Sequence, residues 1–188
     1  MSPFAFSGSE PTSSRELTRA NEEVRVAHIT DAFSIAAISH RAWTARNLPA
    51  LPLPSLADME SQWQDSLTSP PSSRHRVLVA LSNGVVVGFA CLMPISESVD
   101  EVSELLIDPD LTRRGHGSRL INAIAETSPS EVAGLALWSD LPALDTFLES
   151  AGWGKSDRTR TLESQDLTLT QYRWVTSLRD SPSESDGS

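Results

Sequence analysis

The stretch Ile107-Asp-Pro-Asp-Leu-Thr-Arg-Arg-Gly-His-Gly-Ser-Arg-Leu120 joins an apolar segment to an amphipathic one and decides the fold. Glycine at positions 115 and 117 allows a tight turn and lets the backbone approach a ligand without an intervening Cβ. The first N–H groups of a helix have no partner inside the helix, and the helix dipole favours anions there. Arg113 and Arg114 add positive charge beside these groups. The stretch therefore predicts a diphosphate-binding loop that opens a helix.

The segments around this loop show strand and helix patterns in a definite order. Helices show apolar residues at a spacing of three or four, strands show alternation or short apolar runs, and Ser82-Asn-Gly84 is typical of a hairpin turn. Strands are predicted at 24–28, 76–81, 85–93, 101–107, 134–138, 155–162 and 167–175, and helices at about 31–46, about 56–67, after Gly117, and at 144–151. The order β-α-α-β-β-β-α-β-α-β-β predicts a mixed α/β domain of α+β character with an antiparallel first half.

Length and composition indicate one domain with polar ends. The chain has 188 residues, 39% of them hydrophobic, which suffices for one core. We interpret residues 1–22 as a flexible leader, 23–178 as the folded domain and 179–188 as a flexible tail, because the ends are rich in Ser, Pro and acidic residues. The apolar runs are too short for a membrane helix, and the N-terminus lacks the pattern of a secretion signal.

Charge and cysteine content narrow the partners and the compartment. The formal net charge is −10, which argues against a nucleic-acid partner and is compatible with a cationic or amine substrate. Cys91 is the only cysteine, so an internal disulfide is excluded and a reducing cytoplasm is expected. His28 and His75 have no ligand partner at a suitable spacing, so no metal site is predicted. Dimers are the commonest oligomers of soluble proteins, which makes a homodimer the default expectation.

Two general phosphate-binding motifs fit the glycine loop poorly. A dinucleotide-binding loop reads G-x-G-x-x-G directly after a strand, with an acid about 20 residues later. Gly115 and Gly117 match in part and Asp140 has a suitable place, but Leu120 replaces the third glycine. A dinucleotide-binding module therefore stays as a remote alternative. The sequence contains no G-x-x-x-x-G-K-S/T motif of a nucleoside triphosphatase.

The loop closely resembles motif A of the GNAT family of N-acetyltransferases, which reads Q/R-x-x-G-x-G/A. Thr112 occupies the Gln or Arg position, while Gly115 and Gly117 keep the two small residues. Val86-Val-Gly-Phe-Ala90 is similar to the family's third strand, and Ala143-Leu-Asp-Thr-Phe-Leu-Glu-Ser-Ala-Gly-Trp153 to its motif B, A-x-x-F-Y-x-x-x-G-F. The resemblance covers about residues 24–178. It implies the GNAT fold, a mixed but mostly antiparallel sheet of about seven strands flanked by about four helices.

The resemblance also implies a reaction and a set of cofactor contacts. Members move an acetyl group from acetyl-CoA to an amine by direct attack, through a tetrahedral intermediate. The acceptor would be a small-molecule or peptide amine, with neither nucleic acid nor membrane as partner. The strand before the loop splays from its neighbour, and the pantetheine pairs with its backbone. By that resemblance the residues holding acetyl-CoA would be Leu105, Leu106, Ile107, Arg113, Arg114, Gly115, His116, Gly117 and Ser118.

Proton transfer is where the sequence departs from the family. Members often protonate the leaving thiolate with a motif B tyrosine, but Leu148 occupies that position here, and the only tyrosine is Tyr172. A domain that binds acyl-CoA with little or no catalysis is therefore the main alternative. For the base, several members place a water-linked glutamate on the strand before the loop. Glu104 is the preferred candidate and Glu101 the second, and strand alternation predicts that they lie on opposite faces.

Four other residues could contribute to a site. Cys91 lies in an apolar strand and is expected to be a small core residue rather than a nucleophile. We expect His116, inside the glycine loop, to face phosphate or solvent. Trp43 and Trp63 lie in the two early helices, which cover the acceptor side in this family, and they either wall the pocket or belong to the core.

Overall fold

A computed structural model describes residues 21–46, 53–164 and 167–179 of the chain. Residues 1–20 of the expected leader, residues 180–188 of the expected tail and most of the proline-rich segment after Arg46 lie outside these residues. Glu22, which the sequence placed in the leader, is instead the first residue of the sheet. The strands are β1 (Glu22–Val26), β2 (Arg76–Ser82), β3 (Val85–Pro94), β4 (Val99–Ile107), β5 (Gly134–Ser139), β6 (Gly154–Ser164) and β7 (Leu167–Ser177). The helices are α2 (Ala32–Ala45), α3 (Leu56–Thr68), α4 (His116–Thr127) and α5 (Pro142–Ser150), with short 3-10 turns at η1 (Ile29–Asp31) and η2 (Pro109–Leu111).

The strands form one seven-stranded sheet in the order β1-β2-β3-β4-β5-β7-β6. Strands β4 and β5 pair in parallel, and every other neighbouring pair in this sheet is antiparallel. The β2–β3 hairpin turns at Asn83 and Gly84, whose φ angles of 51° and 79° suit a tight hairpin. The mixed, mostly antiparallel sheet with four helices confirms the predicted fold class and element order.

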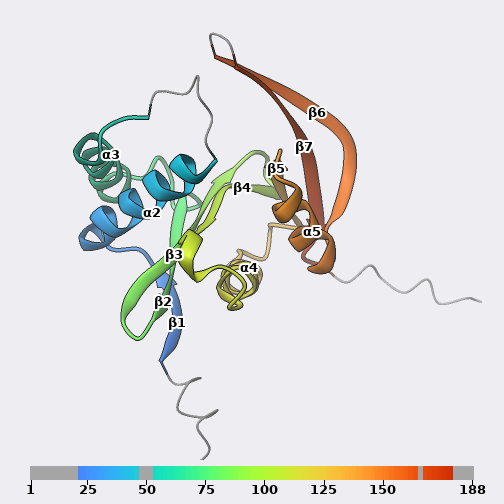
Figure 1. The fold of residues 1–188 in the computed structure, drawn as a ribbon. Coiled ribbons are helices and arrows are strands. Elements are labelled where there is room, and N and C mark those ends of the chain that lie inside the picture. Colours follow the sequence, from blue (N-terminus) through green and yellow to red (C-terminus); the bar gives the residue numbers. More distant parts are fainter. Residues whose placement is uncertain (1–20, 47–52, 165–166, 180–188) are drawn as a thin grey trace, which may run out of the picture.

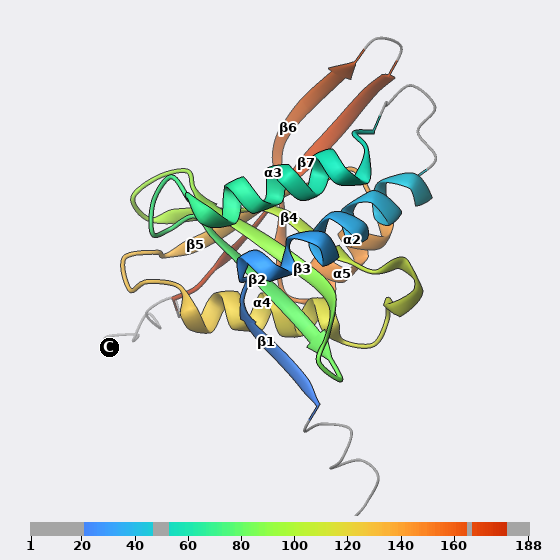
Figure 2. The same cartoon turned by 90° about the vertical axis from the view of Figure 1, so that its left-hand side faces the viewer.

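The helices cover the two faces of the sheet in pairs, α2 with α3 and α4 with α5 (Figure 1). Under α2 and α3 lies a core cluster of Ile35, Ile38, Val79, Leu81 and Phe89. A larger cluster under α4 and α5 includes Val102, Leu120, Ile124, Leu135 and Leu148. Figure 2 shows α4 running along its face of the sheet, and the long β6–β7 ribbon extending past the body of the domain.

A bulge in β4 changes which side chains share a face of the sheet. Val102 pairs with Leu92 and Glu104 with Cys91, so Ser103 has no partner on β3. An extra residue in one strand shifts the alternation of side chains by one position. Val102 and Leu105 consequently both pack into the α4–α5 core. Glu101 and Glu104 both lie on the other face, so the prediction that they lie on opposite faces is wrong.

A buried ion pair ties the start of β4 to the segment before β2. Asp100 is fully buried, and its carboxylate accepts hydrogen bonds from the Nε and Nη2 atoms of Arg74. The same guanidinium donates to the carbonyl oxygens of Glu97 and Val99. Removing one partner of such a pair leaves the other charge buried without compensation.

We expect Arg74→Met to lower the free energy of unfolding by about 3–5 kcal/mol, because Asp100 would then stay buried without its cation. Urea denaturation followed by tryptophan fluorescence measures the change. The matched control is Arg74→Met with Asp100→Leu, which removes both charges and should recover most of the loss. A double variant as unstable as the single one would contradict this account.

Candidate active site

Strands β4 and β5 separate along the second half of β4. Their pairing runs from Val99 with Gly134 to Val102 with Leu137 and then stops. Beyond that point β4 still pairs with β3 on its other side, through Ile107 with Gly88. The edge of β4 that faces β5 is therefore open, and its backbone groups are free to pair with an extended ligand.

Alternation along β4 determines which backbone groups face this opening. The N–H of Asp108 donates to the carbonyl oxygen of Val87 on β3, at 2.9 Å. Successive residues of a strand present their N–H and C=O groups to opposite edges. Ile107 and Leu105 consequently present theirs to the opening, whereas Leu106 presents its own to β3. The side chain of Leu106 packs in the α2–α3 cluster.

A pocket of about 670 Å³ lies at this opening, between β4, the glycine loop, the start of α4 and one side of α5. It brings together seven of the nine residues predicted to hold acetyl-CoA, while Leu106 and Arg114 do not line it. Its lining residues are Leu105, Ile107, Leu111, Thr112, Arg113, Gly115, His116, Gly117, Ser118, Leu141, Ala143, Leu144, Thr146, Phe147 and Ser150.

The loop at the floor of the pocket has the backbone geometry of an anion site. Arg113 and Gly115 have left-handed φ angles of 64° and 84°, and turns of this kind form concave clusters of N–H groups. A left-handed arginine costs of order 1–3 kcal/mol, and such strain concentrates at ligand clamps. Helix α4 starts at His116 without a side-chain cap. Its first i to i−4 hydrogen bond runs from the Arg119 N–H to the Gly115 carbonyl oxygen. The N–H groups at 116–118 are thus available to a ligand.

The sequence predicted that the His116 side chain faces phosphate or solvent. The structure shows instead that the imidazole is buried. It is only 3% exposed, and its Nδ1 lies 3.2 Å from Nη1 of Arg119 and 3.9 Å from Oε2 of Glu22 on β1. Burial lowers the pKa of His116, and Arg119 and Arg114 act in the same direction, against Glu22. His116 therefore contributes its backbone to the pocket. Its side chain is buried beside Arg119 and Glu22, whose ion pair joins α4 to β1.

Helix α5 presents the phenyl ring of Phe147 to the pocket. The family motif predicts a proton donor at the next residue. Phe147 lies over the loop, so that a Cβ on Gly117 would be 3.5 Å from its ring. The next residue, Leu148, is fully buried in the α4–α5 core. Tyr172, 39% exposed on β7, is not among the lining residues, and its ring lies 3.7 Å from Nζ of Lys155. The described pocket therefore contains no tyrosine hydroxyl.

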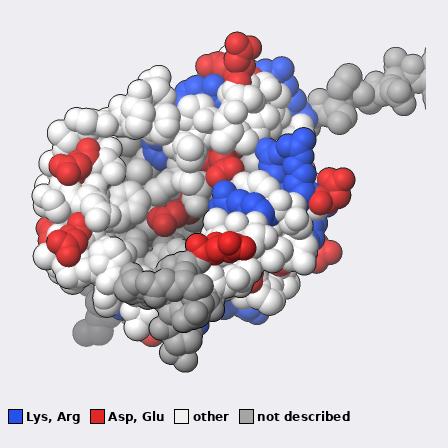
Figure 3. Space-filling model, turned by 90° about the horizontal axis from the view of Figure 1, so that it is seen from above, with Lys and Arg blue, Asp and Glu red and all other residues white. Residues whose placement is uncertain are grey.

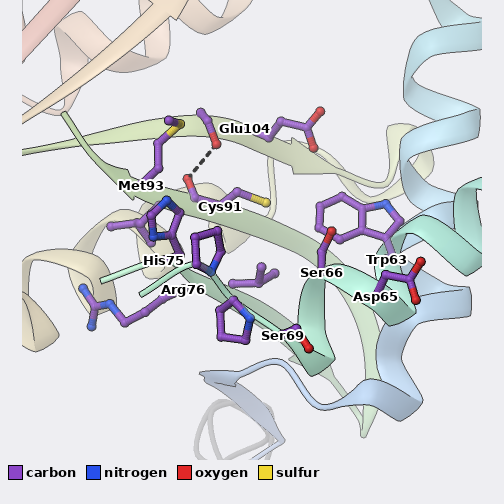
Figure 4. A pocket seen from close by; sticks show the side chains of 14 residues that line it. Trp63, Asp65, Ser66, Ser69, His75, Arg76, Cys91, Met93 and Glu104 are labelled. Carbon is purple, nitrogen blue, oxygen red and sulfur yellow. Dashed lines mark hydrogen bonds between the residues drawn. The ribbon is translucent and has the colours of Figure 1, made fainter. Parts of the chain in front are cut away.

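Glu104 lies on the opposite face of β4, in a hollow under α2 and α3. Burial raises the pKa of its carboxyl group, and Oε2 is buried without a hydrogen-bond partner among the described residues. Figure 4 shows Glu104 and Cys91 on neighbouring strands, with Trp63 and Ser66 of α3 beside them. Burial and the nearby Glu104 both raise the pKa of the Cys91 thiol, which agrees with a structural rather than a nucleophilic cysteine.

Glu101 lies on the same face but is held by other side chains. Its Oε2 accepts a 3.0 Å hydrogen bond from the Trp138 indole, and its Oε1 lies 4.0 Å from Nη1 of Arg160. Arg160 also donates to Gln171, at 2.7 Å. Both oxygens of Glu101 therefore have partners, whereas Oε2 of Glu104 has none among the described residues.

Asp140 is also engaged, which weakens the dinucleotide alternative. It forms an ion pair with Arg46 at the end of α2 and accepts a hydrogen bond from Gln171. Its carboxylate therefore links α2 to β7 instead of facing the glycine loop. Seen from above, the surface of the domain is hollowed, with acidic groups in the hollow and basic groups beside it (Figure 3).

The sequence analysis did not identify two residues that lie beside Glu104 and Glu101 on the α2–α3 face of the sheet. Ser39 and Trp138 look like an ordinary helix serine and a strand tryptophan, and their place appears only when α2 packs on β4 and β5 pairs with it. Within the described ranges, no group of three His, Cys, Asp or Glu side chains could hold a metal. No helix among the described residues is long and apolar enough to cross a membrane.

An α/β sheet split at its parallel strands, with a glycine loop beside the split, defines an acetyltransferase-type fold, and residues 37–153 match the family model "Acetyltransferase (GNAT) family". The chain belongs to this family. It is 32% identical over 81 residues to a mycothiol acetyltransferase of Kineococcus radiotolerans, covering 42% of this chain and 27% of that protein. A second mycothiol acetyltransferase, of Thermomonospora curvata, is 33% identical over 63 residues, 34% of this chain and 21% of the relative. The matched segments thus span about a quarter of these relatives.

Solved structures show the same fold at low sequence identity. An N-acetyltransferase of Staphylococcus aureus Mu50 superposes with a TM-score of 0.66 at 17% identity, covering 85% of this chain and 99% of the other. A putative acetyltransferase of Salmonella typhimurium, solved with its cofactor acetyl-CoA, gives a TM-score of 0.63 at 15% identity, with coverage of 86% and 96%.

Proposed function

We propose that this chain is an N-acyltransferase that moves the acetyl group of acetyl-CoA to an amine. The observation that carries the proposal is the open edge of β4 ending at an uncapped, glycine-rich helix start. The edge suits the amide groups of pantetheine, and the N–H groups at 116–118 suit its pyrophosphate. Family membership and the acetyltransferase relatives support the same reading.

The open edge of β4 and its α2–α3 face serve different substrates. Acetyl-CoA supplies an activated acyl group as its thioester. Leu105 and Ile107 hold the pantetheine backbone from one side, and Glu104 faces the acceptor from the other. The acceptor ammonium gives one proton to the Glu104 carboxylate, and the free amine then attacks the thioester carbonyl directly. As the tetrahedral intermediate releases the CoA thiolate, the nitrogen loses its second proton to water and a neutral amide remains. Holding the two reactants in contact is itself a large part of such catalysis.

The leaving thiolate receives no proton from a tyrosine in this proposal. Leu148 is apolar and buried, so protonation falls to solvent at the open end of the pocket. A thiolate is a stable leaving group, as the pKa of about 8.5 of a cysteine thiol indicates, so the proposed reaction proceeds without a general acid.

The second candidate function is an acyl-CoA-binding domain with little catalysis, and Leu148 is the observation that favours it. The two functions share the pocket and differ only in turnover. Thiol release in the presence of amines separates them.

We expect isothermal titration calorimetry to detect acetyl-CoA and CoA binding, with no binding of NAD. Thiol release from acetyl-CoA should then rise in the presence of a panel of primary amines. Acetyl-CoA binding without amine-dependent thiol release would favour the acyl-CoA-binding domain with little catalysis. NAD binding without CoA binding would refute both and support the dinucleotide alternative.

A further inference from the structure

Two cavities on the α2–α3 face of the sheet share Glu104, and their lining residues differ in polarity. One, of about 220 Å³, lies between α2 and α3 and is lined by Ser39, Trp43, Met59, Gln62, Trp63, Ser66 and Glu104. The other, of about 810 Å³, lies over β2, β3 and β4 beside the end of α3. Trp63, Ser66 and Glu104 line both, so the Glu104 side chain is shared by the two cavities.

The small cavity contains two polar groups that need a partner. The hydroxyl of Ser39, in a residue only 2% exposed, and Oε2 of Glu104 are both buried without a hydrogen bond among the described residues. Buried polar groups are rarely left unpaired, because each costs about 1–3 kcal/mol. A ligand with several N–H donors and a positive charge would satisfy both.

The walls of the small cavity also favour a cation. Trp43 and Trp63 line it with indole rings, and ring faces attract ammonium groups. One face of Trp43 is already taken by a cation, because the guanidinium of Arg46 lies over that ring, 4.6 Å from its centre. Trp63 packs edge-on against Phe89, with the ring centres 5.3 Å apart. Aromatic walls with a carboxylate and a hydroxyl form a site for an ammonium head.

The large cavity is suited to an apolar body. Its walls come from Trp63, Pro70, Pro71, Val77, Leu92 and Met93. Asp65, Glu104 and His75 also line it, and Figure 4 shows Met93 and His75 across the cavity from Trp63. The guanidinium of Arg76 is directed away, because its Nη1 donates to the carbonyl of Thr127 at the end of α4. No arginine or lysine head therefore meets a ligand among the described lining residues, and a carboxylate there would lie near acidic groups.

We infer that the acceptor is a primary amine with an apolar body and no carboxylate, its ammonium held by Glu104 and Ser39 and its body in the large cavity. This rests on the proposed function and names its substrate class. An amino acid or acidic peptide would bring a negative charge toward Glu104 and Asp65. A small alkylamine would leave the large cavity unfilled.

Three acceptors that differ by one feature test the inference. With saturating acetyl-CoA, kcat/KM for 2-phenylethylamine should exceed that for phenylalanine, the same molecule with a carboxylate, by at least about tenfold, and that for ethylamine by a similar factor. A chain that prefers phenylalanine, or uses ethylamine equally well, would overturn the inference and leave the proposed function standing. Failure to bind acetyl-CoA would instead refute the proposed function.

Two variants test separately the site for the ammonium group and the site for the apolar body of the acceptor. Met93→Asp puts a charge in the large cavity at a residue 37% exposed, and should lower the ratio of kcat/KM for 2-phenylethylamine to kcat/KM for ethylamine about fivefold or more. Ser39→Ala should raise KM for both amines and also raise the free energy of unfolding, because it removes an unpaired buried hydroxyl. Calorimetry should show an unchanged Kd for acetyl-CoA in both.

Equilibrium binding decides the case in which no amine is acetylated. Titration of the acetyl-CoA complex with 2-phenylethylamine should quench tryptophan fluorescence, with a weaker response in Met93→Asp. Absence of a saturable response in the unmodified protein would overturn the inference.

Discussion

Gly117→Glu is expected to raise the Kd for acetyl-CoA at least about a hundredfold, a loss of roughly 2.7 kcal/mol, while the protein stays folded. The new carboxylate would stand among the N–H groups at 116–118, where the pyrophosphate is proposed to lie. It would repel the ligand and also compete for its donors. An acidic residue in the first turn of a helix is favourable in the free protein, so the melting temperature should not fall. Calorimetry and thermal unfolding measure the two effects separately.

Gly117→Ala is the matched control. A Cβ at this position would lie 3.5 Å from the Phe147 ring, which is ordinary van der Waals contact, and the family motif also accepts alanine. Its Kd should stay within about threefold of the unmodified chain. Retained affinity in Gly117→Glu would remove the pyrophosphate from this loop, and equal losses in both variants would indicate a packing effect at Phe147.

The predictable part of the fold depends on local patterns. Asn83-Gly84 defines its hairpin, the glycine loop defines the start of α4, and Gly152 follows the last turn of α5 with a φ of 82°. Each of these signals acts within a few residues. The order of strands and helices follows from them, and with the family resemblance it indicates the sheet.

What the sequence could not predict depends on packing between distant segments. Ser103 has no turn or glycine signal, yet it bulges, and the bulge decides that Glu101 and Glu104 share a face. His116 turns inward because Glu22 and Arg119 lie behind it, and Glu22 is 94 positions away along the chain. The polar groups around Glu104 likewise come from α2 and α3, so their empty hydrogen-bonding capacity is visible only after folding.

Glu104→Gln is expected to lower kcat about a hundredfold, the usual contribution of a general base, and to leave the Kd for acetyl-CoA within about twofold. The amide keeps the size of the side chain but cannot take the proton of the amine. Because burial raises the pKa of Glu104, kcat/KM of the unmodified protein should rise with pH through that raised value. This limb should be missing in the variant, whereas the acceptor's own titration at higher pH should appear in both. An unchanged pH profile would remove Glu104 from proton transfer.

The same shift predicts an opposite effect on stability. The folded protein binds the Glu104 proton more tightly than the unfolded chain, so this contribution to stability is full below the unfolded carboxyl pKa of about 4.3 and is lost as pH rises through the folded one. Above the unfolded carboxyl pKa, the folded chain therefore carries a cost at Glu104, as a buried charge or a retained proton, that Gln lacks. Urea denaturation should show Glu104→Gln to be more stable than the unmodified chain at pH 7, with the advantage shrinking toward pH 4. If Glu104→Gln is both slower and more stable, the lost activity does not come from a damaged fold. If it is less stable, the ionised carboxylate is held by a partner in the folded protein.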